Sequence, residues 1–189
     1  MAICPNCDKK SLSPILRSKP FLIVKESFTN NEFEQDLLFT LSGKNKYGYD
    51  ENTTSYYLMK ELGMAGVSMQ TISLSALWLH TPPKVKKTTK EGRAQFQKCL
   101  DWSISEVVKV AQGKKIVMLM GAEVVKTFIM KSVSDVAGLV CKSDLLPSVN
   151  VIIPAPNPDN IMKQPIGELR FSIKSFAEQI KIHEEYTRI

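Results

Sequence analysis

The chain has 189 residues, of which 43% are hydrophobic and 23% are charged, and this ordinary globular balance excludes a disordered protein. No apolar run approaches the ~18 residues of a membrane span, and the first residues lack the charged and apolar regions of a signal peptide. We therefore expect an intracellular protein, cytoplasmic or associated with the nucleoid, that is not secreted and binds no membrane. The net charge of +6 fits solubility as well as polyanion binding.

The first half of the chain contains two apolar runs that predict buried strands, at residues 21–24 and 71–77. Between them, residues 29–54 are polar and predict a loop with a turn of helix at 33–41. A helix then begins at Thr54 or Ser55 and continues to Leu62, because Gly63 follows as a helix stop.

The second half repeats the alternation of helix and strand. An amphipathic helix is predicted at residues 91–111, followed by a strand at 115–120, a helix at 121–130, a strand at 149–153 and a helix at 167–183. Apolar strands that alternate with helices are typical of a parallel sheet covered on both faces. The sequence therefore predicts one α/β domain over residues 1–189, a three-layer α/β/α sandwich with a central, mainly parallel four-stranded sheet.

Ligands of such open sheets bind at the carboxyl ends of the strands. We therefore expect binding residues in the predicted loops that follow the four strands, at residues 25–31, 77–87, 121–123 and 154–163.

The cysteines point to a metal. Cys4 and Cys7 are separated by two residues in a chain without an export signal, which favours metal or redox chemistry over a disulfide. Such a pair needs two more ligands, and the better candidates are His80, beside a Pro-Pro pair, and Cys99. The alternative is a set of reduced thiols that bind nothing. Cys141 has no place in this group and is expected to be a small buried hydrophobic residue.

Several short fragments, in this order, carry a resemblance to a known family: Cys4-x-x-Cys7, Lys25-Glu-Ser-Phe28, Phe39-x-x-x-Gly43, His80-Thr-Pro-Pro83, Cys99, Leu119-Met-Gly-Ala122 and Pro154-Ala-Pro-Asn-Pro158. Over nearly its whole length the chain resembles the iron–sulfur-containing group of the uracil-DNA glycosylase superfamily. The resemblance implies the fold of that superfamily, and departures from its pattern suggest a rapidly diverged member of viral origin.

In the resembled family four cysteines hold a [4Fe–4S] cluster, and their positions fall on Cys4, Cys7, His80 and Cys99 here. The third position is histidine rather than cysteine. Three cysteines and one histidine form a common zinc site, whereas histidine ligation of a [4Fe–4S] cluster is unusual. Both a [4Fe–4S] cluster and zinc therefore remain as expected cofactors.

The resemblance also assigns the catalytic positions. Glu26 matches a carboxylate that activates water or stabilises the sugar cation. Ala76 and Ala155 replace the asparagine that reads the flipped base and the histidine that stabilises the leaving uracil, although Asn157 carries an amide nearby. We therefore expect a DNA-binding protein with a degenerate catalytic site, an accessory or scaffolding component of DNA replication or repair with a protein partner there. The alternatives are an active glycosylase that uses Glu26 and Asn157, and a non-catalytic protein-interaction module.

Three groups of residues are candidates for DNA contact. In the resembled glycosylases the last loop carries an apolar wedge that fills the gap left by a flipped base, and that position falls on Ile161, Met162 and Lys163 here. Phe39 can stack on a base. The basic stretch that follows Pro83 is expected to contact phosphates through Lys84, Lys86 and Lys87. The alternatives are loop and core packing for the apolar residues and a solvated helix start for the lysines.

Overall fold

The computed structural model describes residues 3–27, 54–84, 88–158 and 166–187. Its centre is a four-stranded sheet with the order β2-β1-β3-β4, in which every neighbouring pair is parallel. The strands are β1 (Phe21–Ser27), β2 (Ser73–Trp78), β3 (Ile116–Met120) and β4 (Val151–Ala155). The predicted α/β class and parallel sheet are confirmed.

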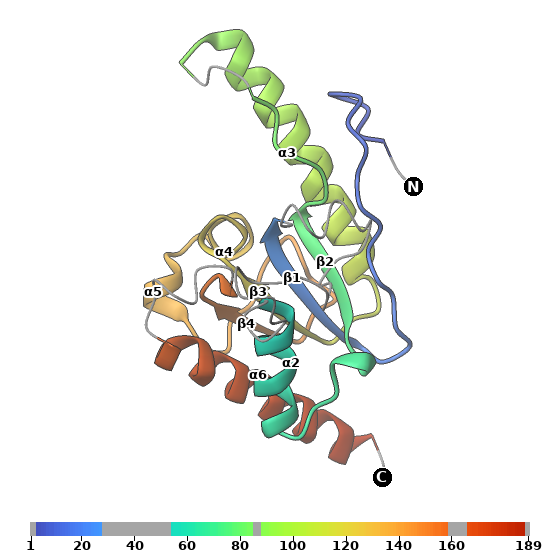
Figure 1. The fold of residues 1–189 in the computed structure, drawn as a ribbon, viewed down its shortest axis with the longest axis vertical. Helices are drawn as coiled ribbons and strands as arrows, with labels where there is room; N and C mark the ends of the chain where they lie inside the picture. The colour runs from blue at the N-terminus through green and yellow to red at the C-terminus, as the bar shows by residue number, and fades with distance from the viewer. Residues whose placement is uncertain (1–2, 28–53, 85–87, 159–165, 188–189) are drawn as a thin grey trace, which may run out of the picture.

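The helices cover both faces of the sheet (Figure 1). They are α2 (Thr54–Met64), α3 (Lys90–Ala111), α4 (Ala122–Ile129), α5 (Val133–Val136) and α6 (Ile166–Tyr186), with a 3-10 turn η2 (Met69–Thr71) before β2. Thr89 caps α3 by accepting a hydrogen bond from the backbone N–H of Gly92. The four predicted helices therefore lie close to the predicted positions, whereas α5 and η2 are additional.

Three of the four strands are longer at their carboxyl ends than the apolar pattern predicts, β2 by one residue, Trp78. β1 includes Lys25, Glu26 and Ser27, which we expected to belong to the following loop. β4 likewise continues to Ala155. The charged or small residues at these ends interrupt the apolar run, but hydrogen bonding to the neighbouring strands continues past it.

The core has two layers, one on each face of the sheet. Successive side chains of β1 point alternately into the two layers: Phe21 and Ile23 belong to one buried cluster, and Leu22 and Val24 belong to the other. The first cluster packs β1 against α2 and α6, and the second packs it against α3 and α4. Because the central strands are buried on both faces, they appear in the sequence as continuous apolar runs.

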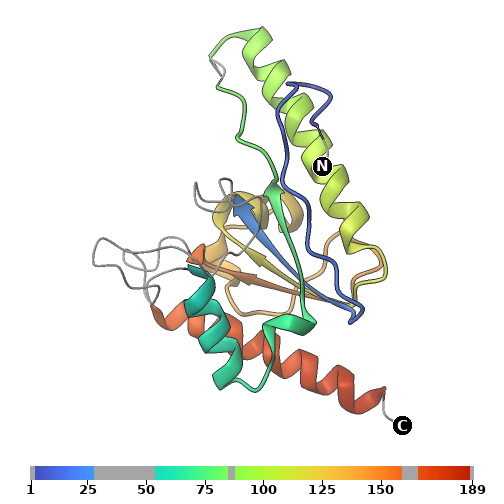
Figure 2. The ribbon, with the colours of Figure 1, turned by 45° about the vertical axis from the view of Figure 1, so that its right-hand side comes forward.

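The N-terminal segment runs beside β2 and α3 (Figure 2). Ile15 exchanges two backbone hydrogen bonds of 2.8 Å with Leu74, and the N–H of Leu12 donates to the carbonyl of Leu79 at 2.7 Å. These bonds bring the first ten described residues to the carboxyl end of β2. No helix in the described ranges is long and apolar enough to cross a bilayer.

Candidate metal centre

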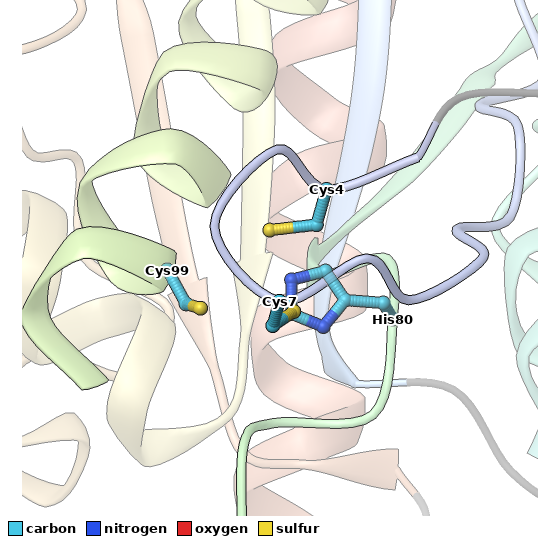
Figure 3. A group of neighbouring side chains, drawn as sticks. All are labelled: Cys4, Cys7, His80 and Cys99. Carbon is cyan, nitrogen blue, oxygen red and sulfur yellow. The ribbon is translucent and has the colours of Figure 1, made fainter. Parts of the chain in front are cut away.

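Four side chains from three distant segments meet at the carboxyl end of β2. Cys4 and Cys7 come from the N-terminal segment, His80 follows β2, and Cys99 lies on α3 (Figure 3). Their ligand atoms all lie within 4.8 Å of one another. Cys4, His80 and Cys99 are 0% exposed, and Cys7 is half-buried. The structure therefore brings together the four residues predicted to be metal ligands, in a geometry that can bind a metal ion.

A tight turn directs both N-terminal thiols toward the same point. The carbonyl of Cys4 accepts hydrogen bonds from the N–H of Asp8, at 2.9 Å, and of Cys7, at 3.4 Å. Asp8 has a φ of 52°, a left-handed conformation that asparagine and aspartate tolerate better than most residues. The N–H of Cys4 then donates to the carbonyl of Lys9 at 3.0 Å, which closes the turn.

Polar contacts outside the ligand group hold this turn against α3. The Asn6 amide donates to the carbonyl of Lys98 at 2.9 Å. The Gln95 amide donates in the opposite direction, to the carbonyl of Asn6, and lies 3.8 Å from the sulfur of Cys99. These two hydrogen bonds, through Gln95 and Lys98, attach α3 to the turn close to the thiol of Cys99.

Lys9 joins the same turn to the segment after β2. Its ammonium donates to the carbonyls of Thr81, at 3.0 Å, and Pro82, at 3.1 Å. A positive charge at this position also favours thiolate ligands, because three thiolates and one neutral imidazole around a divalent ion carry a net negative charge.

The hydrogen bonds of His80 leave one ring nitrogen available as a ligand. Nδ1 lies 2.9 Å from the carbonyl of Thr81, to which it can only donate. Within the described part of the chain, the buried Nε2 has no hydrogen-bond partner. A buried polar atom without a partner is costly, and metal-bound histidines commonly donate their other nitrogen to a carbonyl. His80 therefore has the tautomer of a ligand that binds through Nε2.

Burial also sets the protonation of the group in the absence of a metal. Burial raises the pKa of Cys4. For Cys99, burial and the neighbouring thiols of Cys7 and Cys4 all act in the same direction and raise its pKa to about 12. Burial lowers the pKa of His80, although its bond to Thr81 opposes this shift. At neutral pH the thiols of Cys4 and Cys99 are thus protonated and His80 is neutral, so a metal ion must displace protons from sulfur.

Two tryptophan rings lie against the imidazole of His80, and one of them also contacts Phe96. Its ring centroid lies 5.9 Å from that of Trp78 and 5.5 Å from that of Trp102, and Trp78 lies 5.3 Å from Phe96. His80 is fully buried among these rings, and an apolar shell of this kind limits solvent access to a metal site.

Trp78 also connects the centre to the acid at the end of β1. Its indole N–H donates to Oε2 of Glu123 at 2.9 Å, and the backbone N–H of Glu123 donates to Oε2 of Glu26 at 3.0 Å. Glu26 therefore caps the N-terminus of α4. Trp78 and Glu123 were not singled out from the sequence, although both lie in segments, 77–87 and 121–123, where binding residues were expected.

Gly121, which precedes α4, allows this capping arrangement. It has a φ of 118°, and a Cβ added to it would lie 2.5 Å from Oε2 of Glu26. The carboxylate thus packs directly against the glycine, a position that any side chain would fill.

The two alanines at the predicted base-reading positions lie on the opposite face of the sheet. Ala76 and Ala155 are fully buried in the cluster that packs against α2 and α6. Glu26 instead contacts α4, which covers the other face. Asn157 follows β4 and is half-buried.

The described residues include one of the predicted DNA contacts, Lys84, whose side chain is exposed directly after Pro83. Cys141 lies apart from the metal ligands and packs, half-buried, against the α3–α4 side of the core. The remaining candidates lie outside the described residues: Phe39, Lys86, Lys87, Ile161, Met162 and Lys163.

No protein-family model matches the chain, and a comparison with curated proteins found no relative.

Proposed function

We propose that this chain is a DNA-binding protein with a uracil-DNA-glycosylase-like fold, a metal centre and a degenerate catalytic site, acting as an accessory component of DNA replication or repair. One observation carries the proposal: Cys4, Cys7, His80 and Cys99, which the resemblance pairs as ligands, converge within 4.8 Å at the carboxyl end of a parallel sheet. This is the edge at which open α/β sheets bind their ligands.

The spacing of the ligand atoms favours a single zinc ion over an iron–sulfur cluster. A tetrahedral zinc ion with Zn–S bonds of about 2.3 Å separates its ligand atoms by roughly 3.8 Å. In a [4Fe–4S] cluster each ligand binds a different iron, so the ligands stand further apart. Separations within 4.8 Å and one histidine ligand both support zinc.

Metal analysis of the purified chain decides between these ions. We expect one zinc per chain by elemental analysis and a colourless protein after anaerobic purification. Iron in stoichiometric amount, with an absorbance band near ~400 nm from sulfur-to-iron charge transfer, would instead identify a cluster.

The loss of catalysis is supported by the residues at the base-reading positions. The methyl groups of Ala76 and Ala155 neither donate nor accept hydrogen bonds, and both are buried. The carboxylate of Glu26 stabilises α4. We expect no uracil release from single-stranded or mismatched DNA, and turnover that disappears in Glu26→Gln would establish the active glycosylase instead.

DNA binding is proposed to involve the lysines that follow Pro83. Lys84 is exposed and follows a segment that is attached to the metal-site turn, because the carbonyls of Thr81 and Pro82 accept hydrogen bonds from Lys9. Cationic side chains at this place are suited to phosphates, whose contacts dominate nucleic-acid affinity.

Fluorescence anisotropy with a single-stranded oligonucleotide tests this interface. We expect Lys84→Gln with Lys86→Gln to weaken binding at least fivefold and to reduce the slope of log K against log salt by about 1.4, since each lost contact contributes about 0.7. The matched control is Lys174→Gln with Lys181→Gln, two exposed lysines of α6 on the other side of the sheet. Equal effects of the two pairs would exclude this interface, and no DNA binding by the unmodified chain would favour a protein-interaction module.

A further inference from the structure

A single row of residues crosses the carboxyl edge of the sheet. In the register of the strands, Lys25 on β1 is paired with Ala76 on β2 and with Met120 on β3, and Met120 is paired with Ala155 on β4. Paired residues of parallel strands point to the same face of a sheet. The row therefore places Lys25 directly beside Ala76, with Met120 between Lys25 and Ala155.

The lysine points into the protein. Ala76, Met120 and Ala155 all belong to the buried cluster beneath α2 and α6. Ile23, two residues before Lys25 on the same strand, belongs to it too, so the alternation of β1 directs Lys25 to this face. The Lys25 side chain is 1% exposed and is among the largest fully buried side chains of the described residues.

Such a position is rare for lysine, which is almost never fully buried because its ammonium loses hydration. Lys25 has the longest side chain of this row, and it lies next to the small side chain of Ala76. Lys25 takes no part in the metal centre or in the capping of α4.

We propose that Lys25 fills the pocket that a flipped base would have to enter, so that this protein binds DNA without accepting a base. The inference depends on the proposed function, because the resemblance identifies Ala76 and Ala155 as base-reading positions. Two changes then act together: the hydrogen-bonding groups are replaced by methyl groups, and the side chain of Lys25 takes up the space next to Ala76.

The test compares two variants that differ only at Lys25. One carries Ala76→Asn and Ala155→His, which restore the polar groups while Lys25 remains. The other adds Lys25→Gly, which removes the whole side chain from the row. Binding of free uracil is measured by NMR titration on the full chain, with circular dichroism as the check on folding.

We expect the triple variant to bind uracil at least tenfold more tightly than the double variant and the unmodified chain. Equal affinities of the double and triple variants would overturn the proposal, because Lys25 would then not obstruct the pocket. The proposal is overturned as well if the triple variant gains no uracil binding.

A measurement on the unmodified chain keeps the proposal testable if a variant does not fold. Acylation with an amine reagent, read by mass spectrometry, should modify the exposed Lys84 and Lys174 at least tenfold faster than Lys25. Comparable rates at Lys25 and Lys84 would show an accessible pocket and overturn the proposal. Neither measurement uses DNA, so a failure of DNA binding in the anisotropy experiment is distinguishable from a failure of this inference.

Discussion

Oε2 of Glu26 accepts a hydrogen bond of 3.0 Å from the backbone N–H of Glu123, so the acid at the end of β1 stabilises the first turn of α4. The first N–H groups of a helix have no partner within the helix, and a negative charge is favourable there. A residue expected to be catalytic therefore has a structural role in the arrangement of these two elements.

Glu26→Ala is expected to lower the free energy of unfolding by about 1–2 kcal/mol, the usual cost of losing a helix cap. Glu26→Gln, which keeps an oxygen acceptor but not the charge, should cost about half as much. Urea denaturation of both variants measures the difference. Unchanged stability in Glu26→Ala would mean that the carboxylate does not cap α4 in solution.

Gly121→Ala is expected to destabilise the chain by about 2–3 kcal/mol, because a residue other than glycine at a φ of 118° is strained and its Cβ would collide with Glu26. Gly63→Ala is the matched control, since no atom lies within 4 Å of its added Cβ and the residue lies inside α2. That control should stabilise the chain by about 0.5–1 kcal/mol. A similar melting temperature for both variants would contradict the close approach of Glu26 to Gly121.

Cys99→Ser is expected to abolish stoichiometric metal binding, since the serine hydroxyl is a poor substitute for a buried thiolate. If metal binding stabilises the chain by about 4 kcal/mol, as it does at a free metal concentration 1,000-fold above Kd, the melting temperature falls by roughly 10 °C. Cys141→Ser, outside the ligand group, should retain the metal. Equal metal content in both variants would remove Cys99 from the centre.

Metal affinity is expected to fall steeply as the pH is lowered. The raised pKa values of Cys4 and Cys99, the latter to about 12, mean that both thiols are protonated without metal at neutral pH, and a bound ion must displace both protons. His80 releases none, because its lowered pKa keeps it neutral. Each displaced proton makes the affinity change tenfold per pH unit, so two give at least ~100-fold between pH 7.5 and 6.5.

Competition with a zinc chelator at several pH values checks this proton linkage, and calorimetry in buffers of different ionisation enthalpy counts the released protons. Fewer than two protons would mean that one of these thiols is already ionised, or is not a ligand.

Much of the fold could be predicted because the sheet is buried on both faces. Runs such as those of β3 and β4 are then continuously apolar, and the amphipathic pattern of α3 is long enough to identify a helix. The turns α5 and η2 are too short for any periodicity to be detected. The carboxyl end of β1 was missed for a different reason, because Lys25 is charged and the pattern treats a charged residue as the end of a buried strand.

The metal ligands were predictable because they are chemically rare in this chain, which has two histidines and four cysteines. The pairing of Trp78 with Glu123 was not, because a hydrogen bond between a strand and a distant helix depends on packing that no local pattern encodes. The burial of Lys25 was likewise hidden, since it follows from strand register rather than from residue type.

The origin of the ligands in three segments has a consequence for biosynthesis. Cys4 and Cys7 leave the ribosome long before His80 and Cys99, so during translation they are an incomplete, solvent-exposed dithiol. Their turn has few bonds of its own, and its contacts with Lys98, Gln95 and Thr81 exist only after β2 and α3 are in place. A metal ion bound by all four ligands would therefore be acquired late in maturation, and until α3 has docked the two thiols are protected from oxidation only by a reducing environment.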